Sequence, residues 1–251
     1  MSQDERELLE GRNAVTEALR AGAAIDKIYV AHSDGKGTPD HTLRRITAMA
    51  KDAGIVVVDC DRRKLDGMSV TQAHQGVIAS LAAAAYAEVE DILALAAARG
   101  EKPLIVACDE LSDPHNLGAI IRTAECAGAH GVIIPKRRSA GLTAIVSKTS
   151  AGAVSHLPVA RVPNLVNCLK DLQKQGLWVF GTAADGDKSL YEADLAGASV
   201  IVIGSEGDGM GRLVAQTCDF KVSIPMRGQV SSLNASAAAA ILLYEAVRQR
   251  G

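Results

Sequence analysis

The chain has 251 residues, of which 48% are hydrophobic, and a formal net charge of −2. This length allows one large domain or two small ones, and the apolar fraction suits a packed core. Aromatic residues make up only 3%, which argues against a binding surface built on aromatic stacking, and the net charge excludes a broad basic surface but not a local patch.

The five cysteines are widely spread without a C-x-x-C pair, and the six histidines show no ligand spacing with them. We therefore expect reduced thiols, as in a cytoplasmic protein, and no metal site. The first ten residues are polar and acidic, which predicts no secretory signal. No apolar run reaches about 18 residues, so no membrane span is expected.

Residues 1–82 read as a small α/β domain that is large enough to fold alone. A helix is predicted after Gly11, with Asn13 as its cap, and a second over 41–53. Strands are predicted over 27–31, 55–59 and 75–81. Residues 1–10 are expected to be frayed, and the basic run Arg62-Arg63-Lys64 is expected to be solvated.

Residues 83–101 are predicted to be a linker and a connecting helix. Residues 82–87 carry no turn signal and no charge. An amphipathic pattern then predicts a helix over 88–99, which Gly100 ends. A second domain, 102–251, follows.

Strands and helices alternate from residue 103 onward, which is typical of a parallel sheet covered on both faces. Strands are predicted over 104–108, 131–134, 157–162, 177–181, 200–203 and 220–224. Helices are predicted over 117–126 and 142–148, from a cap at Asn164 to Gly176, and from a serine cap to Arg250. Three of the strands lead into polar loops, at 182–185, 204–209 and 225–236, and ligands of open α/β sheets bind outside the carboxyl ends of strands.

The last of these loops combines three features within about a dozen residues. Pro225 ends the strand because it lacks an N–H, and Gly228 allows a tight reversal. Ser231 or Ser232 is the expected N-cap of the following alanine-rich helix. A free backbone beside a helix N-terminus suits a small, partly charged ligand, although an ordinary β-to-α turn explains the spacing equally well.

The glycine-rich turn at 204–211 is not a phosphate-binding motif. It does not read G-x-G-x-x-G after a first strand, and no G-K-[ST] follows it. A nucleotide-like ligand without phosphates fits this turn better.

Three segments carry a resemblance to a known family. They are Asp109-x-x-x-Asp113-Pro114-x-Asn116-x-Gly118-x-x-x-Arg122-x-Ala124, Val202-Ile203-Gly204-Ser205-Glu206-Gly207-x-Gly209, and Ile224-Pro225-Met226 with Ser232-Leu233-Asn234-x-Ser236. In this order, over about 130 residues, they resemble the signature motifs of the SpoU/TrmH family of S-adenosylmethionine-dependent RNA ribose 2′-O-methyltransferases. Gly11-Arg12-Asn13-Ala14-Val15 and His74-Gln75-Gly76-Val77 are similar to the RNA substrate-binding domain of the same family.

Three positions depart from the family pattern. Ala235 and Ala237 stand where valine is usual, which removes bulk but no polar function. Ser155 stands where an acidic residue is expected, so no role is assigned to that position.

The resemblance implies a SPOUT-type α/β trefoil-knot catalytic domain behind a small L30e-like α/β domain. It also implies a homodimer formed through the knotted domain. The cofactor would be S-adenosylmethionine, held by Thr182, Gly204, Ile224, Met226 and Leu233. The partner would be ribosomal RNA. Within the family, the chain most resembles the enzymes that methylate a guanosine in the peptidyl-transferase region of 23S rRNA.

By the same resemblance, the catalytic residues are Asn116, Arg122, Glu206, Ser232 and Asn234. The ribose oxygen must be aligned behind the methyl carbon, and its proton must leave. A guanidinium stays protonated, so Arg122 is expected to hold an RNA phosphate and stabilise developing alkoxide charge rather than act as the base. A phosphate oxygen or Glu206 would accept the proton, while Asn116, Ser232 and Asn234 would orient the reacting groups.

Alternatives to this interpretation stay open at this stage. The target could be a tRNA ribose or an rRNA adenosine, or the chain could be a non-catalytic RNA-binding assembly factor. Without the motifs, Arg122 reads as a surface arginine, Asn116 as a helix cap and Asn234 as a local backbone partner. The basic run Lys136-Arg137-Arg138 follows a strand of the second domain, and there we expect contact with RNA phosphates.

Overall fold

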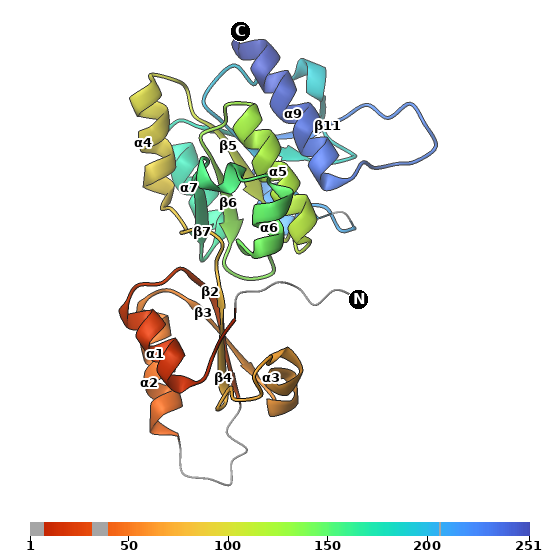
Figure 1. The fold of residues 1–251 in the computed structure, drawn as a ribbon. Coiled ribbons are helices and arrows are strands. Elements are labelled where there is room, and N and C mark those ends of the chain that lie inside the picture. The colour runs from red at the N-terminus through yellow and green to blue at the C-terminus, as the bar shows by residue number, and fades with distance from the viewer. Residues whose placement is uncertain (1–7, 32–39, 206) are drawn as a thin grey trace. The chain divides into compact units, whose positions relative to one another are not determined.

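The computed structural model describes residues 8–31, 40–205 and 207–251, which belong to two compact units (Figure 1). Unit 1 comprises Met1–Ala85 with Gly141–Ala144, and unit 2 comprises Tyr86–Ala140 with Ile145–Gly251. The connecting helix expected within 83–101 thus belongs to unit 2. None of the described helices has the length and apolar character needed to cross a membrane.

Unit 1 contains a mixed four-stranded sheet in the order β1-β4-β2-β3. The strands are β1 (Leu8–Glu10), β2 (Ile25–Ala31), β3 (Val56–Cys60) and β4 (Val77–Leu81). Strands β2 and β3 are parallel, whereas β4 runs antiparallel to both β1 and β2. The strands expected over 27–31, 55–59 and 75–81 are therefore confirmed within a few residues.

The helices of unit 1 lie on both faces of this sheet (Figure 1). On one face, α1 (Arg12–Arg20) and α2 (His41–Asp52) bury Val15 and Ile46 against the strands. On the other face, the short helix α3 (Arg62–Met68) buries Leu65. Apolar side chains from both sides of the strands are thereby removed from water, which is the main stabilising term.

Two expectations for unit 1 are wrong. Residues 8–10 form β1 instead of fraying, while 1–7 lie outside the described residues. The N-cap of α1 is Gly11 and not Asn13, because the Arg12 N–H bonds to Gln75 Oε1 and the helix starts directly after β1. The basic run at 62–64 is exposed, as expected, and it forms the first turn of α3, which the Asp61 side chain caps by accepting from Lys64 N.

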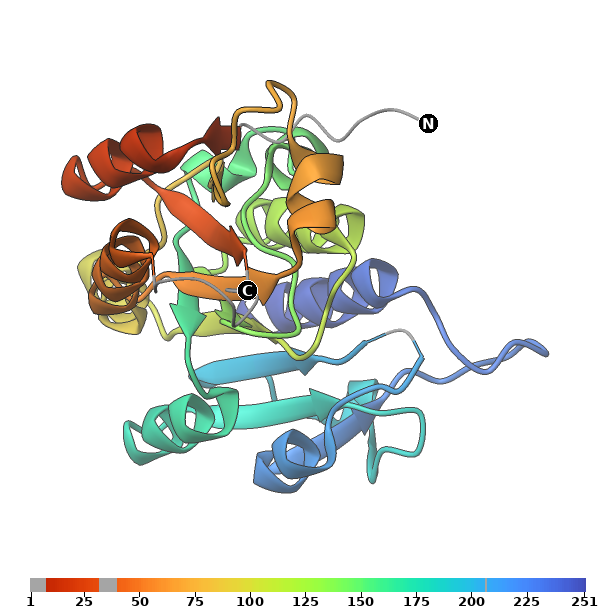
Figure 2. The same cartoon turned by 90° about the horizontal axis from the view of Figure 1, so that it is seen from below.

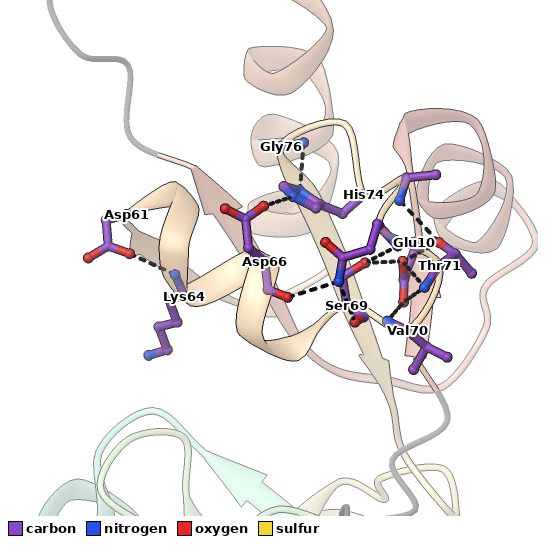
Figure 3. Close-up of polar contacts among 11 residues, drawn as sticks. Glu10, Asp61, Lys64, Asp66, Ser69, Val70, Thr71, His74 and Gly76 are labelled. Atoms are coloured by element: carbon purple, nitrogen blue, oxygen red, sulfur yellow. Dashed lines mark hydrogen bonds and ion pairs between the residues drawn. The ribbon is translucent and has the colours of Figure 1, made fainter.

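A polar cluster holds the loop that leads into β4 (Figure 3). The Glu10 carboxylate accepts hydrogen bonds from Ser69 Oγ at 2.5 Å, from Val70 N at 2.6 Å and from Thr71 N and Oγ1. Partial burial acts to raise the pKa of Glu10, but these hydrogen bonds outweigh it and lower the pKa from 4.5 to about 2. The carboxylate therefore anchors residues 69–71 in its ionised form.

His74 fixes the second half of the same loop (Figure 3). Its ring is 2% exposed, and Nδ1 accepts a hydrogen bond from Gly76 N at 3.0 Å. Because Nδ1 is the acceptor, the neutral ring carries its proton on Nε2. That nitrogen donates to Asp66 Oδ1 at 2.9 Å, so the histidine ties the loop to α3.

Unit 2 contains a seven-stranded sheet in the order β7-β6-β5-β10-β8-β11-β9. The strands are β5 (Leu104–Cys108), β6 (Gly131–Pro135), β7 (Val159–Val162), β8 (Trp178–Thr182), β9 (Lys188–Ser189), β10 (Ser199–Ile203) and β11 (Phe220–Ser223). All neighbouring pairs are parallel. The expected parallel α/β architecture is confirmed.

Helices cover both faces of this sheet, as continuous apolar strands require. They are α4 (Val89–Arg99), α5 (Pro114–Cys126), α6 (Ala144–Thr149), α7 (Leu165–Lys174), α8 (Arg212–Thr217) and α9 (Ala235–Arg250). Residues of α4, α7 and α8 share one buried cluster with the strands. Helices α5 and α9 pack against each other, α5 also against β6 and α9 against β10.

The path of the chain after β11 brings distant segments together. Strand β11 lies beyond β8 in the sheet, on the side away from β5. Helix α9 nevertheless packs on α5 and β10. Residues 224–234 must therefore cross the carboxyl ends of β8 and β10, and the trefoil knot that the resemblance implies stays a prediction.

Replacing Glu10 by glutamine is expected to lower the free energy of unfolding at pH 7 by about 1 kcal/mol. The amide has one acceptor oxygen where the carboxylate has two, and the effect stays small because solvent partly screens the charge of Glu10. The pKa of Glu10 is lowered, so its contribution is present above pH 4.5 and is lost as the pH falls toward 2. Urea unfolding of wild type and variant over this pH range checks the expectation.

Glu17→Gln is the matched control, because the Glu17 carboxylate pairs with Arg20 on the exposed surface of α1. Its effect should stay within about 0.5 kcal/mol. Equal stability of the two variants at pH 7 would show that Glu10 does not anchor the loop.

Candidate active site

A hydrogen bond between two asparagines joins the start of α5 to the start of α9. Asn234 Nδ2 donates to Asn116 Oδ1 at 2.9 Å, across 118 positions of sequence. Asn116 lies in the first turn of α5 and is 5% exposed. Two predicted site residues are thus in direct contact.

Asn234 is also the N-cap of α9. Its Oδ1 accepts hydrogen bonds from Ser236 N at 2.9 Å and from Ser236 Oγ at 2.6 Å. The expected cap at Ser231 or Ser232 is therefore wrong: the loop continues to Asn234, whose amide accepts from its own helix and donates to Asn116. This double use fixes the orientation of the amide.

The carboxyl ends of three adjacent strands gather the predicted cofactor residues Thr182, Gly204 and Ile224. In the sheet register Thr182 stands beside Val222 of β11, and Gly181 stands beside Val202 of β10. Thr182 Oγ1 donates to Val202 O at 3.0 Å. The parallel strands therefore place these residues along one edge, as the sequence predicted.

The turn after β10 folds tightly on itself. Ser205 and Gly209 exchange backbone hydrogen bonds of 2.9 and 3.1 Å. A Cβ on Gly204 would lie 2.3 Å from the carbonyl carbon of Gly209, so only glycine fits there. Glu206, the predicted proton acceptor, lies outside the described residues.

Asp109 links this turn to β5, and no role was predicted for it from the sequence. The residue follows β5 directly, is 5% exposed, and its Oδ2 accepts from Gly211 N at 2.7 Å. Burial raises the pKa of Asp109, with a smaller contribution from Glu110, while the Gly211 hydrogen bond and Arg138 act to lower it. The sequence signal that could have indicated this contact is a carboxylate directly after a continuous apolar strand.

The loop between β11 and α9 extends outward from unit 2 in Figures 1 and 2. Ser232 in this loop is exposed. Met226 and Leu233 are each 38% exposed, and Ile224, nearest the strand, is half-buried. The structure therefore brings Ile224 to the edge of the sheet but leaves Met226, Ser232 and Leu233 on an open segment.

Arg122 lies on the exposed surface of α5, almost two turns beyond Asn116. Its side chain forms no hydrogen bond or ion pair with any residue that the structure describes. Gly118, between them, allows close packing of α6, because a Cβ there would lie 1.8 Å from Thr149 Oγ1. The helix thus presents an exposed cation on the same element as the buried Asn116.

Comparison with known families matches both units. Residues 103–244 match the SpoU rRNA Methylase family. Residues 8–87 match a family described as RNA 2′-O ribose methyltransferase substrate binding. Unit 2 corresponds to the first match, and most of unit 1 to the second.

Individual proteins agree with these matches. The Bacillus subtilis protein YacO, which carries the name of a TrmH family tRNA/rRNA methyltransferase, is 46% identical over 100% of this chain and 98% of its own length. The SpoU methyltransferase AviRb of Streptomyces viridochromogenes, crystallised with AdoMet, is 26% identical over 97% of this chain and 90% of its own, with a TM-score of 0.61.

Two further structures differ in the RNA that their descriptions mention. An AdoMet-bound rRNA methyltransferase of Sinorhizobium meliloti is 25% identical, covers 96% of this chain and 86% of its own, and has a TM-score of 0.57. A TrmH/SpoU tRNA modifying enzyme of A. aeolicus is 29% identical with a TM-score of 0.55. It covers only 60% of this chain and 76% of its own.

Replacing Asp109 by asparagine is expected to keep or raise stability at pH 7, since an amide oxygen still accepts from Gly211 without a buried charge. A raised pKa means that the stability due to Asp109 is greatest below pH 3.8 and falls as the pH rises through the folded-state value. The difference between variant and wild type should therefore shrink as the pH is lowered toward 3.8 in thermal unfolding.

Asp109→Ala provides the comparison, because it leaves the Gly211 N–H without its acceptor. It should cost about 1–3 kcal/mol. Equal losses in the two variants at pH 7 would show that the charge itself is required.

Proposed function

The chain belongs to the SpoU rRNA methylase family, and we propose that it methylates the ribose 2′-OH of a guanosine in the peptidyl-transferase region of 23S rRNA. The family fixes the reaction as S-adenosylmethionine-dependent 2′-O-methylation of tRNA or rRNA. The choice of 23S rRNA and of guanosine rests on the motif resemblance and on unit 1.

Unit 1 is the observation that favours rRNA. Residues 8–87, which include its mixed sheet, match the substrate-binding family. The rRNA methyltransferase of S. meliloti aligns with nearly the whole chain, whereas the tRNA modifying enzyme aligns with 60% of it. A second RNA-binding unit suits a large folded RNA, in which the target ribose must be selected among many.

The residues at the strand ends fit S-adenosylmethionine. The edge of β10, β8 and β11 offers backbone groups at the Gly204 turn, the Thr182 hydroxyl and the side chain of Ile224, and the open loop that follows carries the apolar side chains of Met226 and Leu233. It has no phosphate-binding motif. A nucleoside that carries a sulfonium-linked amino-acid arm and no phosphate matches this set of groups, and we propose that these five residues hold it.

S-adenosylmethionine supplies a methyl carbon on a positively charged sulfur, which leaves as a neutral thioether. The chain must align the ribose oxygen behind that carbon and remove its proton. Asn116 and Asn234 hold one another and would orient the ribose with Ser232. Arg122 would bind the adjacent phosphate and stabilise alkoxide charge, and a phosphate oxygen or Glu206 would accept the proton.

A homodimer is also proposed. Ala237, Ile241 and Tyr244 are exposed on α9 at spacings that place them on one face of the helix. Ile241 is 38% and Tyr244 is 53% exposed. An apolar stripe of this kind, next to the site, favours pairing with a second copy.

Arg122→Ala is expected to lower kcat for RNA methylation by about 10²–10³-fold, as expected for loss of a group that stabilises transition-state charge. Its affinity for S-adenosylmethionine should equal that of wild type, as measured by calorimetry. Arg99→Ala, which changes an exposed arginine of α4 at the opposite end of the strands, is the control. Loss of cofactor binding in Arg122→Ala would contradict the assigned role.

Transfer of labelled methyl groups from S-adenosylmethionine to total RNA of cells lacking this enzyme tests the substrate. We expect label in 23S rRNA, as 2′-O-methylguanosine in the peptidyl-transferase region by nucleotide mapping. Label confined to tRNA or to an rRNA adenosine would replace the proposed target. Absence of label from every RNA would overturn the proposed function.

A further inference from the structure

The basic loop after β6 lies beside the segment that leads to Asn116. Residues 136–139 follow β6, and this strand neighbours β5 in the sheet. Ala140 N donates to Leu111 O at 2.8 Å, and Ser139 Oγ donates to the same oxygen at 3.3 Å. These bonds join the basic loop to residues 109–113, which run directly into α5.

An ion pair joins two residues that both have an unusual backbone conformation. Arg138 Nη1 bonds to Glu110 Oε1 at 2.7 Å. Both residues have positive φ angles, 56° for Arg138 and 52° for Glu110, a region that residues other than glycine rarely adopt. Backbone strain of this kind persists only where the surroundings impose it, and it is concentrated at functional sites.

The neighbouring carboxylates are engaged within the protein. Asp109 is buried against Gly211 N, Glu110 pairs with Arg138, and Asp113 caps α5 by accepting from His115 N. Arg137 is exposed and has no hydrogen bond or ion pair with the described part of the chain. Its charge is therefore directed to solvent at the edge of the site.

A second cation supports the loop from the edge strand. Arg161 of β7 donates from Nη2 to Lys136 O at 3.4 Å, and its guanidinium lies 4.9 Å from the centre of the Tyr86 ring. Lys136 N donates to Val162 O at 2.8 Å. The backbone of the loop is thus fixed at both ends while positive charge accumulates around it.

We propose that the loop Lys136–Arg138 binds a backbone phosphate of the substrate RNA next to the target nucleotide, with the Arg137 guanidinium as the principal donor. The planar guanidinium matches two phosphate oxygens, and phosphate contacts fix the register of an RNA without reading its sequence. This inference rests on the proposed function, because it assigns the contact to the RNA that is methylated.

Arg137→Ala should weaken binding of a 23S rRNA transcript about tenfold, the effect of losing one charge-assisted contact. The slope of log Kd against log salt concentration, measured by filter binding, should become less steep by about one. The loss should lie in KM for RNA, with the affinity for S-adenosylmethionine unchanged. Arg137→Lys keeps the positive charge but loses the planar guanidinium. It should retain the wild-type slope, with a Kd between those of the wild type and Arg137→Ala.

Arg99→Ala is the matched control, since it removes another exposed arginine, in the last turn of α4 and before the amino-terminal end of β5. If Arg137→Ala binds RNA as Arg99→Ala does, the inference is wrong. It is also wrong if Arg137→Ala changes the oligomeric state in light scattering, because the loop would then contact a second copy. Failure of the wild type to methylate any RNA overturns the proposed function itself, whichever variant is compared.

Discussion

The hydrogen bond between Asn116 and Asn234 is the contact on which the site depends. It connects α5, which follows strand β5, to α9, the last helix of the chain. The two residues are 118 positions apart. Because Asn234 also caps α9, one amide sets where that helix begins and where it docks on α5. The exposed loop before Asn234 is thereby anchored at its far end, opposite to Ile224 at the edge of the sheet.

A second long-range contact completes the edge. Asp109, directly after β5, accepts a hydrogen bond from Gly211 N at the start of α8, and the two residues are 102 positions apart in the sequence. The two bonds thus tie two polar loops, the turn after β10 and the segment after β11, to the same β5–α5 connection. The neighbouring loop after β6 adds three cations, Lys136, Arg137 and Arg138. Methyl donor, ribose and phosphate would then meet groups that come from separate parts of the chain.

Much of this architecture followed from the sequence, because it depends on local patterns. Continuous apolar strands such as 104–108 predicted a parallel sheet, and all of its neighbouring pairs are parallel. The cap at Asn164 and the end of α4 at Gly100 were also predicted correctly. The errors concern helix caps that depend on tertiary contacts. The hydrogen bond from Arg12 N to Gln75 fixes the start of α1 after Gly11, and the hydrogen bond to Asn116 places the cap of α9 at Asn234 and not at the preceding serines. The role of Asp109 was missed for the same reason, since its partner lies in a distant turn.

A double-mutant cycle on the asparagine pair tests the central claim most directly. Asn116→Ala removes the acceptor, and Asn234→Ser removes the Nδ2 donor while a hydroxyl still caps α9. The measured quantity is kcat/KM for RNA methylation, with thermal unfolding as the check that each variant is folded. The account predicts that the double variant is little worse than either single variant, with a coupling energy above about 1 kcal/mol. Additive losses would contradict it, because the two residues would then act independently.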